Sequence, residues 1–566
     1  MPKPPENEFF IELKQTYLGQ APLAHLDTLT EIGKAGHYSS AQNVDIISKP
    51  GLLTQGPGLA SLTNGTEAGV VSELINFIMD KATAADVTYG IGATKLFKIS
   101  STTVASGGTP SWPRTITNAT DGSSVIDLRG NLYYFYNKSS GGDIGKYDLA
   151  STFTDAWGSV VPTGAAALQS AIHPVAVKED IMVFGNGRYL GTYIDTSTTI
   201  SMTKLDFGTD SVVADVAFHA NQWWIAVNAG VAGTNRTRSQ IYLYDGSVTS
   251  SLLADEVAVG VRRIGFIFPD NGIVYVAYQD LSSSGGFAIG YVSGRRLIHL
   301  RSFTGALPTF AQKTLYKNTI AFISSGLIYS CGAVIGELPV QISQLADGGY
   351  TTIGALAAPF GTPMIASTQS TSYKLAQFSG YDTACNWKSI IFPVVAGRRV
   401  GFIDEIIILT KALLASARCD LIVEANQAVT SGSTFQIISQ NANFTAATTD
   451  IVTSAAHGLP NGTAVTLTST TTLPAGLSVA TTYYVISSTA DTFKLSLSVG
   501  GAAVDITGTG TGTHTWWITG KTRHVFTKIG LGVIEDFRIF LNWANGSATN
   551  DAAVRSIFIK GHWSEK

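Results

Sequence analysis

The sequence predicts an all-β protein, in which a β-propeller of about seven blades is followed by a jelly-roll-like β-sandwich that carries an inserted small β domain. Three observations lead to this prediction. Short β-rich runs, separated by Gly, Pro, Asn and Ser, extend over nearly the whole chain. A loose repeat of such runs fills the middle, and a low-charge β cassette interrupts the strands near the end.

The composition agrees with several domains and with no strongly charged partner. A chain of 566 residues is long for a single core. Charged residues make up only 14% of it, against about a quarter in ordinary globular proteins. Because the net charge is −3, we do not expect sequence-specific nucleic-acid binding or attraction to acidic membranes to be its main function.

Residues 1–60 are predicted to form an extended N-terminal arm. Six prolines in this segment disfavour regular structure: Pro2, Pro4, Pro5, Pro22, Pro50 and Pro57. We expect the arm to lie along an adjacent subunit or to close the propeller by donating a strand. No signal peptide is indicated at the start, and no apolar run of about 18 residues predicts membrane insertion.

Residues 61–385 are predicted to form the propeller. A unit of β-run, polar turn, aromatic β-run, loop and third strand recurs there, about seven times at roughly 35 to 50 residues each. The clearest copy comprises Val212 to His219, Trp223 to Asn228 and Gln240 to Gly246. A second copy comprises Val261 to Phe268, Ile273 to Gln279 and Phe287 to Gly294.

Such a unit cannot cover both of its faces alone. In the run from Trp223 to Asn228 each alternating set contains tryptophan and aliphatic side chains, which favours a strand partly buried on two sides. Radial closure into about six to eight blades covers these faces, and a stacked array of sandwiches is the alternative.

Residues 386–440 and 518–566 are predicted to form one discontinuous β-sandwich. Residues 441–517 interrupt it as a small β module, with expected strands at Ala464 to Leu467, Tyr483 to Ile486 and Phe493 to Leu495. Because insertions are tolerated at exposed loops, the module should occupy a solvent-facing connection, and the two flanking halves should pair with each other.

The module carries an ordered series of motifs. His457-Gly458-Leu459 and Asn461-Gly462 come first, Tyr483-Tyr484-Val485 follows, and the run Gly510 to His514 closes the series. This order resembles the small β module that recurs in tail and other virion proteins of double-stranded DNA bacteriophages. The resemblance covers about a seventh of the chain. It implies a virion structural protein and does not indicate which tail component.

Candidate chemistry is sparse, and we predict no catalytic, cofactor-binding or metal-binding residues. Asp404/Glu405 and Glu535/Asp536 are adjacent pairs, which point to opposite faces of a strand and cannot act together as glycosidase carboxylates. The string Phe153 to Ser159 lacks the sialidase Asp-box pattern, and Tyr89 to Lys95 fits a hairpin better than a phosphate loop. Cys331, Cys385 and Cys419 are expected to be reduced and buried.

Paired aromatic residues are the one candidate for ligand contact. Trp223, Trp224, Tyr133 and Tyr134 could stack on sugar rings if exposed. In an alternating strand, however, one member of each pair normally faces the core. The same alternative applies to the Trp516-Trp517 pair.

The resemblance and composition together favour a non-enzymatic tail component, of the nozzle or tail-tip type, made in the host cytoplasm and located in the virion. Its expected partners are other copies of itself, in a ring of on the order of six or twelve, and neighbouring tail proteins. A receptor-binding or adhesion protein that recognises a host surface glycan or protein is the alternative. A polysaccharide-degrading enzyme is the least favoured interpretation.

Overall fold

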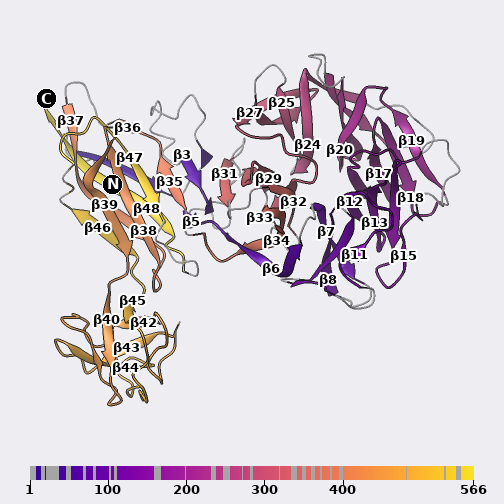
Figure 1. Ribbon diagram of the computed structural model, residues 1–566. Helices are drawn as coiled ribbons and strands as arrows, with labels where there is room; N and C mark the ends of the chain where they lie inside the picture. Colours follow the sequence, from indigo (N-terminus) through magenta and orange to yellow (C-terminus); the bar gives the residue numbers. More distant parts are fainter. Residues whose placement is uncertain are drawn as a thin grey trace. The chain divides into compact units, whose positions relative to one another are not determined.

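The computed structural model contains β-strands throughout and divides into two compact units (Figure 1). One unit comprises 59–342 and 347–379, and the other comprises 1–58, 343–346 and 380–566. The structure describes residues 8–14, 19–20, 37–45 and most of 52–565, with the longest gaps at 158–166, 231–237, 247–254 and 333–340. No helix in these described parts is long and apolar enough to cross a membrane.

The first unit consists of antiparallel sheets that follow one another along the chain. Most of its described strands fall into seven groups, each hydrogen-bonded in chain order. The first four groups are β7 (Ser72–Asp80), β8 (Ala85–Gly92) and β9 (Lys95–Ser100); β12 (Asp121–Leu128), β13 (Asn131–Asn137), β14 (Gly142–Tyr147) and β15 (Phe153–Thr154); β16 (Val175–Lys178), β17 (Ile181–Asn186), β18 (Tyr189–Ile194) and β19 (Ile200–Asp206); and β20 (Ser211–His219), β21 (Gln222–Ala229), β22 (Arg238–Tyr244) and β23 (Asp255–Gly260).

The other three groups complete this unit. They are β24 (Arg262–Asp270), β25 (Ile273–Asp280), β26 (Phe287–Ser293) and β27 (Arg296–Phe303); β28 (Lys313–Tyr316), β29 (Thr319–Ser324) and β30 (Leu327–Gly332); and β32 (Thr352–Ala357), β33 (Met364–Gln369) and β34 (Ser372–Ser379). The strand β6 (Gly58–Glu67) lies next to β34, so a segment from the beginning of the chain completes the last group.

The groups form a closed ring. The first strands contact one another in the order β7, β12, β16, β20 and β24; β24 reaches β29 of the next group, β28 contacts β32, and β32 returns to β7. This arrangement is a β-propeller, and the predicted fold class of propeller, sandwich and inserted small β domain is confirmed.

Both faces of a blade are buried, because neighbouring blades cover them. In β13, Leu132, Tyr134 and Tyr136 pack into one core cluster, whereas Tyr133 and Phe135 pack into another. All five side chains are no more than 1% exposed. The near-continuous apolar run therefore reflects burial on two sides, as its sequence predicted.

A one-residue register shift recurs in the first strands of the blades. It occurs at Ser72/Leu74 in β7, Gly122/Ser124 in β12, Val213/Asp215 in β20, Ile264/Phe266 in β24 and Ile353/Ala355 in β32. Such β-bulges increase the local twist and redirect side chains. In β12 and β20 the residues beside the shift, Ser124 and Asp215, bond the backbone of the next blade.

The second unit contains the β-sandwich. One sheet has the order β1-β48-β37-β46, and the other contains β3-β35-β47-β38-β39. Segments from before and after the module pair directly, because β37 lies between β46 and β48, and β38 pairs with β47. The strands are β1 (Glu8–Lys14), β48 (Val554–Glu565), β37 (Arg399–Thr410), β46 (Arg523–Thr527), β3 (His37–Gln42), β35 (Asn386–Ser389), β47 (Asp536–Asn542), β38 (Arg418–Ala425) and β39 (Ala428–Ile438).

Residues Glu8–Lys14 correct part of the prediction of an extended arm over 1–60, because they form a strand of the sandwich. Seven residues of β1 pair with β48, from Glu8 opposite His562 to Lys14 opposite Ser556. Phe9 and Leu13 are buried, whereas Phe10 is 44% exposed. The prolines lie outside β1, so they did not prevent its apolar face from joining the sandwich. Most other residues before position 52 lie outside the described residues.

The inserted module is a closed barrel with its own core. Its strands follow the order β40-β41-β44-β43-β42-β45, and Figure 1 shows most of them gathered in the orange part of the chain. Their bounds are Asn441–Ala446, Val452–Thr453, Thr492–Ser496, Tyr483–Ile486, Ala464–Ser469 and His514–Ile518, in the same order. The buried cluster around Phe444, Val465, Val485 and Trp516 contains module residues only.

We expect Leu13→Ala to destabilise the sandwich by about 2–5 kcal/mol, because Leu13 is 1% exposed and truncation leaves a cavity. Hydrogen exchange of the β48 amides should increase correspondingly. The matched control is Phe10→Ala on the opposite face of β1, for which we expect a loss below about 1 kcal/mol. Equal effects of the two changes would contradict the placement of β1.

We expect removal of 441–517, with a short glycine linker in its place, to leave the sandwich folded. The two ends of the module are adjacent, since the Ile518 amide donates to the Gln440 carbonyl at 2.8 Å. A short loop can therefore join β39 to β46 at small entropic cost. The measurements are soluble expression and hydrogen-exchange protection of β37, and aggregation of the shortened chain would show that the barrel belongs to the sandwich core.

Candidate functional site

The aromatic residues considered as ligand platforms belong to the propeller core. Tyr133 and Tyr134 are 0% exposed and Trp223 is 1% exposed. Trp224 is half-buried, and its indole N–H donates to the His219 carbonyl at 3.3 Å. A buried ring cannot stack on a ligand from solvent, so Tyr133, Tyr134 and Trp223 are corrected to structural roles, whereas ligand contact by the half-buried Trp224 stays a prediction. Trp516 of the module is also buried.

Tyr134 takes part in a polar cluster instead. Its hydroxyl donates to the Asp155 carboxylate at 2.5 Å, and Thr117 donates to the same group at 2.7 Å. Arg114 lies 2.9 Å from both Asp155 oxygens. Burial, together with the Asp155 carboxylate, raises the pKa of Tyr134 well above its usual value. Asp155 lies in the string that lacks the Asp-box pattern, and its carboxylate has a structural role. It links β11 (Arg114–Thr115) to the next blade.

Buried polar groups also link successive blades. Asp215 of β20 accepts a hydrogen bond from the Ile267 amide of β24 at 2.8 Å. Lys313 of β28 forms an ion pair with Asp215 and donates to the Ile267 carbonyl at 2.7 Å. Because every donor and acceptor in this group has a partner, it fits a structural clamp across three blades.

His173 performs a similar function between the second and third blades. Its amide donates to the Ser123 hydroxyl at 2.7 Å, and its carbonyl accepts from Ser124 at 2.6 Å. Its ring contacts the Gly185 carbonyl through Nδ1 at 3.0 Å, which identifies Nδ1 as the protonated nitrogen. Complete burial lowers the pKa of His173 to about 4, so the ring is neutral at pH 7.

The remaining candidates from sequence have ordinary structural positions. Asp404 is exposed and pairs with His562 at 2.8 Å, and the Glu535 amide donates to Asn426 at 2.7 Å. The residues around the string Tyr89 to Lys95 belong to a β-hairpin as predicted, since β8 and β9 are antiparallel and Gly92 lies opposite Lys95. Cys385 and Cys419 are buried thiols outside any disulfide, and Cys385 donates to the Asp382 carbonyl at 2.9 Å, whereas the side chain of Cys331 lies outside the described residues. Within the described parts, no group of three His, Cys, Asp or Glu side chains could hold a metal ion.

The motif residues of the module stabilise its turns. The buried His457 ring accepts a hydrogen bond from the Leu459 amide at 3.0 Å, across Gly458, whose φ is +62°. The Asn461 side chain accepts from the Ser488 amide at 2.9 Å. His514 contacts the Ser469 hydroxyl at 3.0 Å and the Thr509 carbonyl at 3.1 Å. Both histidines are therefore structural.

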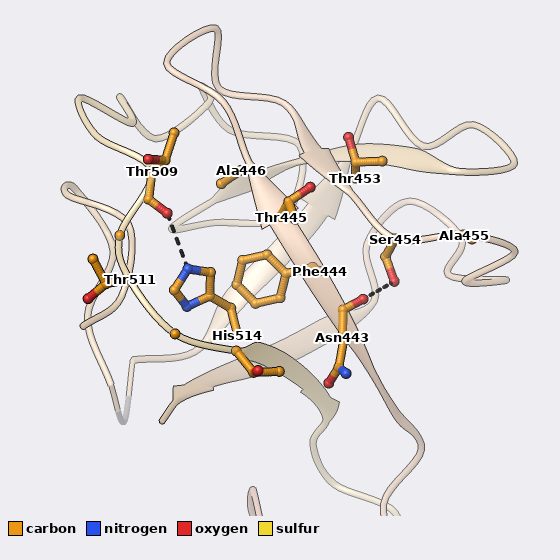
Figure 2. Close-up of a pocket in the computed structure, with 13 residues that line it drawn as sticks. Asn443, Phe444, Thr445, Ala446, Thr453, Ser454, Ala455, Thr509, Thr511 and His514 are labelled. Atoms are coloured by element: carbon orange, nitrogen blue, oxygen red, sulfur yellow. Dashed lines mark hydrogen bonds between the residues drawn. The ribbon is translucent and has the colours of Figure 1, made fainter. Parts of the chain in front are cut away.

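An open groove of about 550 Å³ lies on the barrel surface. Three segments line it, namely Asn443–Ala446 of β40, Thr453–Ala455 and Thr509–His514, and we call it the threonine groove (Figure 2). Figure 2 shows the rings of Phe444 and His514 side by side, with threonine side chains around them. The lining contains no acidic residue, lysine or arginine. The sequence prediction did not include this groove, although its alternating Thr-Gly run was visible.

Comparisons with known proteins do not assign a family. No family model matches the chain, and no curated protein matches it. Among solved structures, it is similar to the extracellular domain of a protein described as a hybrid two-component system from B. thetaiotaomicron, with 12% identity and a TM-score of 0.37 over 62% of this chain and 43% of that one.

Two further solved structures have similar scores. A puromycin-hydrolyzing peptidase of Mycobacterium tuberculosis has 11% identity and a TM-score of 0.37, over 53% of this chain and 49% of that one. The PQQ-bound aldose sugar dehydrogenase of Streptomyces coelicolor has 8% identity and a TM-score of 0.33, over 57% and 98%. The chain thus spans less than half of the first two structures, and at these scores none of them bears on activity.

We expect the propeller to lose stability as the pH falls below about 6.5. The folded pKa of His173 is about 4, below its unfolded value of 6.5. The contribution of neutral His173 to the free energy of unfolding is therefore fully present above pH 6.5. It decreases as the pH falls from 6.5 toward the folded pKa of about 4, by up to about 1.4 kcal/mol per pH unit.

This pH dependence can be measured by urea unfolding at pH 7.5 and at pH 5, followed through hydrogen exchange of β16 and β17. The His173→Gln variant should be less stable at pH 7.5 and should depend less on pH. His219→Gln, at the end of β20, is the matched control and should behave as the unchanged protein. An unchanged pH slope in His173→Gln would show that another group causes it.

Proposed function

We propose that this protein is a non-enzymatic structural component of a bacteriophage virion, of the tail nozzle or tail-tip type. The observation that carries the proposal is the closed barrel at 441–517. Its motif residues resemble the small β module of phage virion proteins, and each described motif has a defined role within one fold. The side chains of His457 and Asn461 accept hydrogen bonds that stabilise turns, and Val485 packs in the core. The His514 ring contacts the Thr509 carbonyl next to the closing run Gly510 to His514.

The motif strings occupy structurally important positions of one barrel, and this supports the resemblance. Scattered short strings can match by chance, whereas these strings occur in order and occupy the turns and core of a single closed unit. The buried polar links of the propeller further favour a structural role, since Asp215 accepts from the Ile267 amide of the next blade and the His173 carbonyl accepts from Ser124 of the preceding one.

Assembly into a ring around the tail axis is part of the proposal. Tail components occur as closed cyclic assemblies, in which one surface of each copy meets a different surface of the next. Neighbouring tail proteins would be the other partners. The competing proposal is an adhesin that recognises a host surface glycan or protein, and the exposed groove of the barrel is the observation that favours it.

Purified particles of the phage that encodes this chain provide the test. We expect quantitative mass spectrometry to find it at a fixed copy number, on the order of six or twelve per particle, and we expect deletion to abolish assembled particles. Intact particles that fail to adsorb would favour the adhesin. Absence of the chain from particles would reject both, and release of reducing ends from host polysaccharide by the purified protein would reject the non-enzymatic role.

A further inference from the structure

We propose that the threonine groove of the inserted barrel is a binding site for a neutral saccharide. The inference rests on the groove itself and does not depend on the proposed virion role. Three features of the groove carry it: an alternating row of hydroxyl groups held by a rigid backbone, exposed threonine hydroxyls on both of its sides, and a lining without acidic, lysine or arginine side chains.

The alternating run Thr509-Gly510-Thr511-Gly512-Thr513 presents its three hydroxyl-bearing side chains to solvent. Gly510 and Gly512 have φ values of +71° and +86°. A Cβ atom on Gly510 would lie 2.6 Å from the Pro474 nitrogen, so the glycine side of the run packs directly on the neighbouring backbone. The run therefore requires glycine at these positions and directs its threonines outward.

Hydrogen bonds hold this run in place. The Thr511 amide donates to the Thr472 carbonyl at 2.9 Å, and the Thr472 amide donates back at 3.1 Å. The Thr513 amide donates to the Thr470 hydroxyl at 2.9 Å, and His514 contacts the Thr509 carbonyl at 3.1 Å. A site with a fixed backbone loses little entropy when a ligand binds.

Five hydroxyl groups of the groove are available to a ligand. They belong to exposed threonines on its two sides and have no hydrogen-bond partner within the described part of the chain: Thr445, Thr453, Thr509, Thr511 and Thr513. Each hydroxyl can both donate and accept, which matches the alternating donors and acceptors of sugar hydroxyls. Ser454, by contrast, is engaged, because it donates to the Asn443 carbonyl at 2.8 Å.

Buried side chains close the base of the groove, since Phe444 and His514 are only 4% and 5% exposed and pack with their ring centroids 5.5 Å apart. A ligand therefore meets the threonine hydroxyls on the two sides of the groove and not the ring faces. A sugar carries hydroxyl groups around its ring, and this rim matches the two sets of threonine hydroxyls. An anionic ligand would find no cationic side chain in the lining, so a phosphate or sulfate group gains no charge-assisted hydrogen bond there.

Saturation-transfer NMR on the full chain tests the proposal with neutral hexasaccharides of glucose, mannose and N-acetylglucosamine as probes. We expect signals from at least one probe. The double variant Thr445→Val/Thr511→Val should weaken its binding on the order of tenfold, because two hydroxyl contacts are lost. The matched control is Thr482→Val, an exposed threonine outside the groove, which should bind as the unchanged chain.

Circular dichroism and hydrogen-exchange protection of the β45 amides verify that the variants are folded. If none of the three neutral hexasaccharides gives a saturation-transfer signal, the proposal is wrong. Undiminished binding by a folded double variant overturns it as well, because the sugar would then bind elsewhere. A sulfated hexasaccharide that binds when the neutral probes do not would assign the protein a different ligand class and reject the neutral one.

Discussion

The structure of the larger unit depends on one constraint, namely that a sheet with two apolar faces must have a neighbour on each side. The strand β13 illustrates it, because its alternate side chains enter two separate cores. A linear series of such sheets would leave its two end faces in water. Closure of the ring removes both ends, since β32 contacts β7 and β6 completes the last blade. The polar links at Asp215 and His173 then set the order of neighbouring blades.

The sequence predicted the propeller because its signal is local. Each blade repeats apolar runs and turns, and the strands around Val212 to His219 and Trp223 to Asn228 appear in the structure with nearly the same limits. Pairings distant in sequence were harder to predict. Phe9 and Leu13 show the alternation of a strand, but its partner lies more than 500 residues away, between Ile557 and Gly561. Composition alone does not identify such a partner, and nearby prolines suggested an irregular arm.

The groove was not predictable for a related reason. Its lining comes from three segments, and Thr509 to Thr513 reads as loop when taken alone. Only the contacts to Thr470, Thr472 and Pro474 show that the threonines face outward. For the buried aromatic residues, the prediction of ligand contact was wrong because it underestimated their burial. Tyr133 and Tyr134 were considered as neighbours on opposite faces, one of them exposed, whereas stacked blades bury both.

The pairing of β1 with β48 and of β6 with the blade that ends at Ser379 has a consequence for biosynthesis. A ribosome delivers β6 more than 300 residues before β34, and β1 more than 500 residues before β48. Until those partners emerge, the early strands have unsatisfied edges that can pair with other nascent chains. Neither unit can finish folding on a truncated polypeptide. Premature termination should therefore produce insoluble fragments that are open to proteolysis, so only full-length chains would accumulate as folded protein.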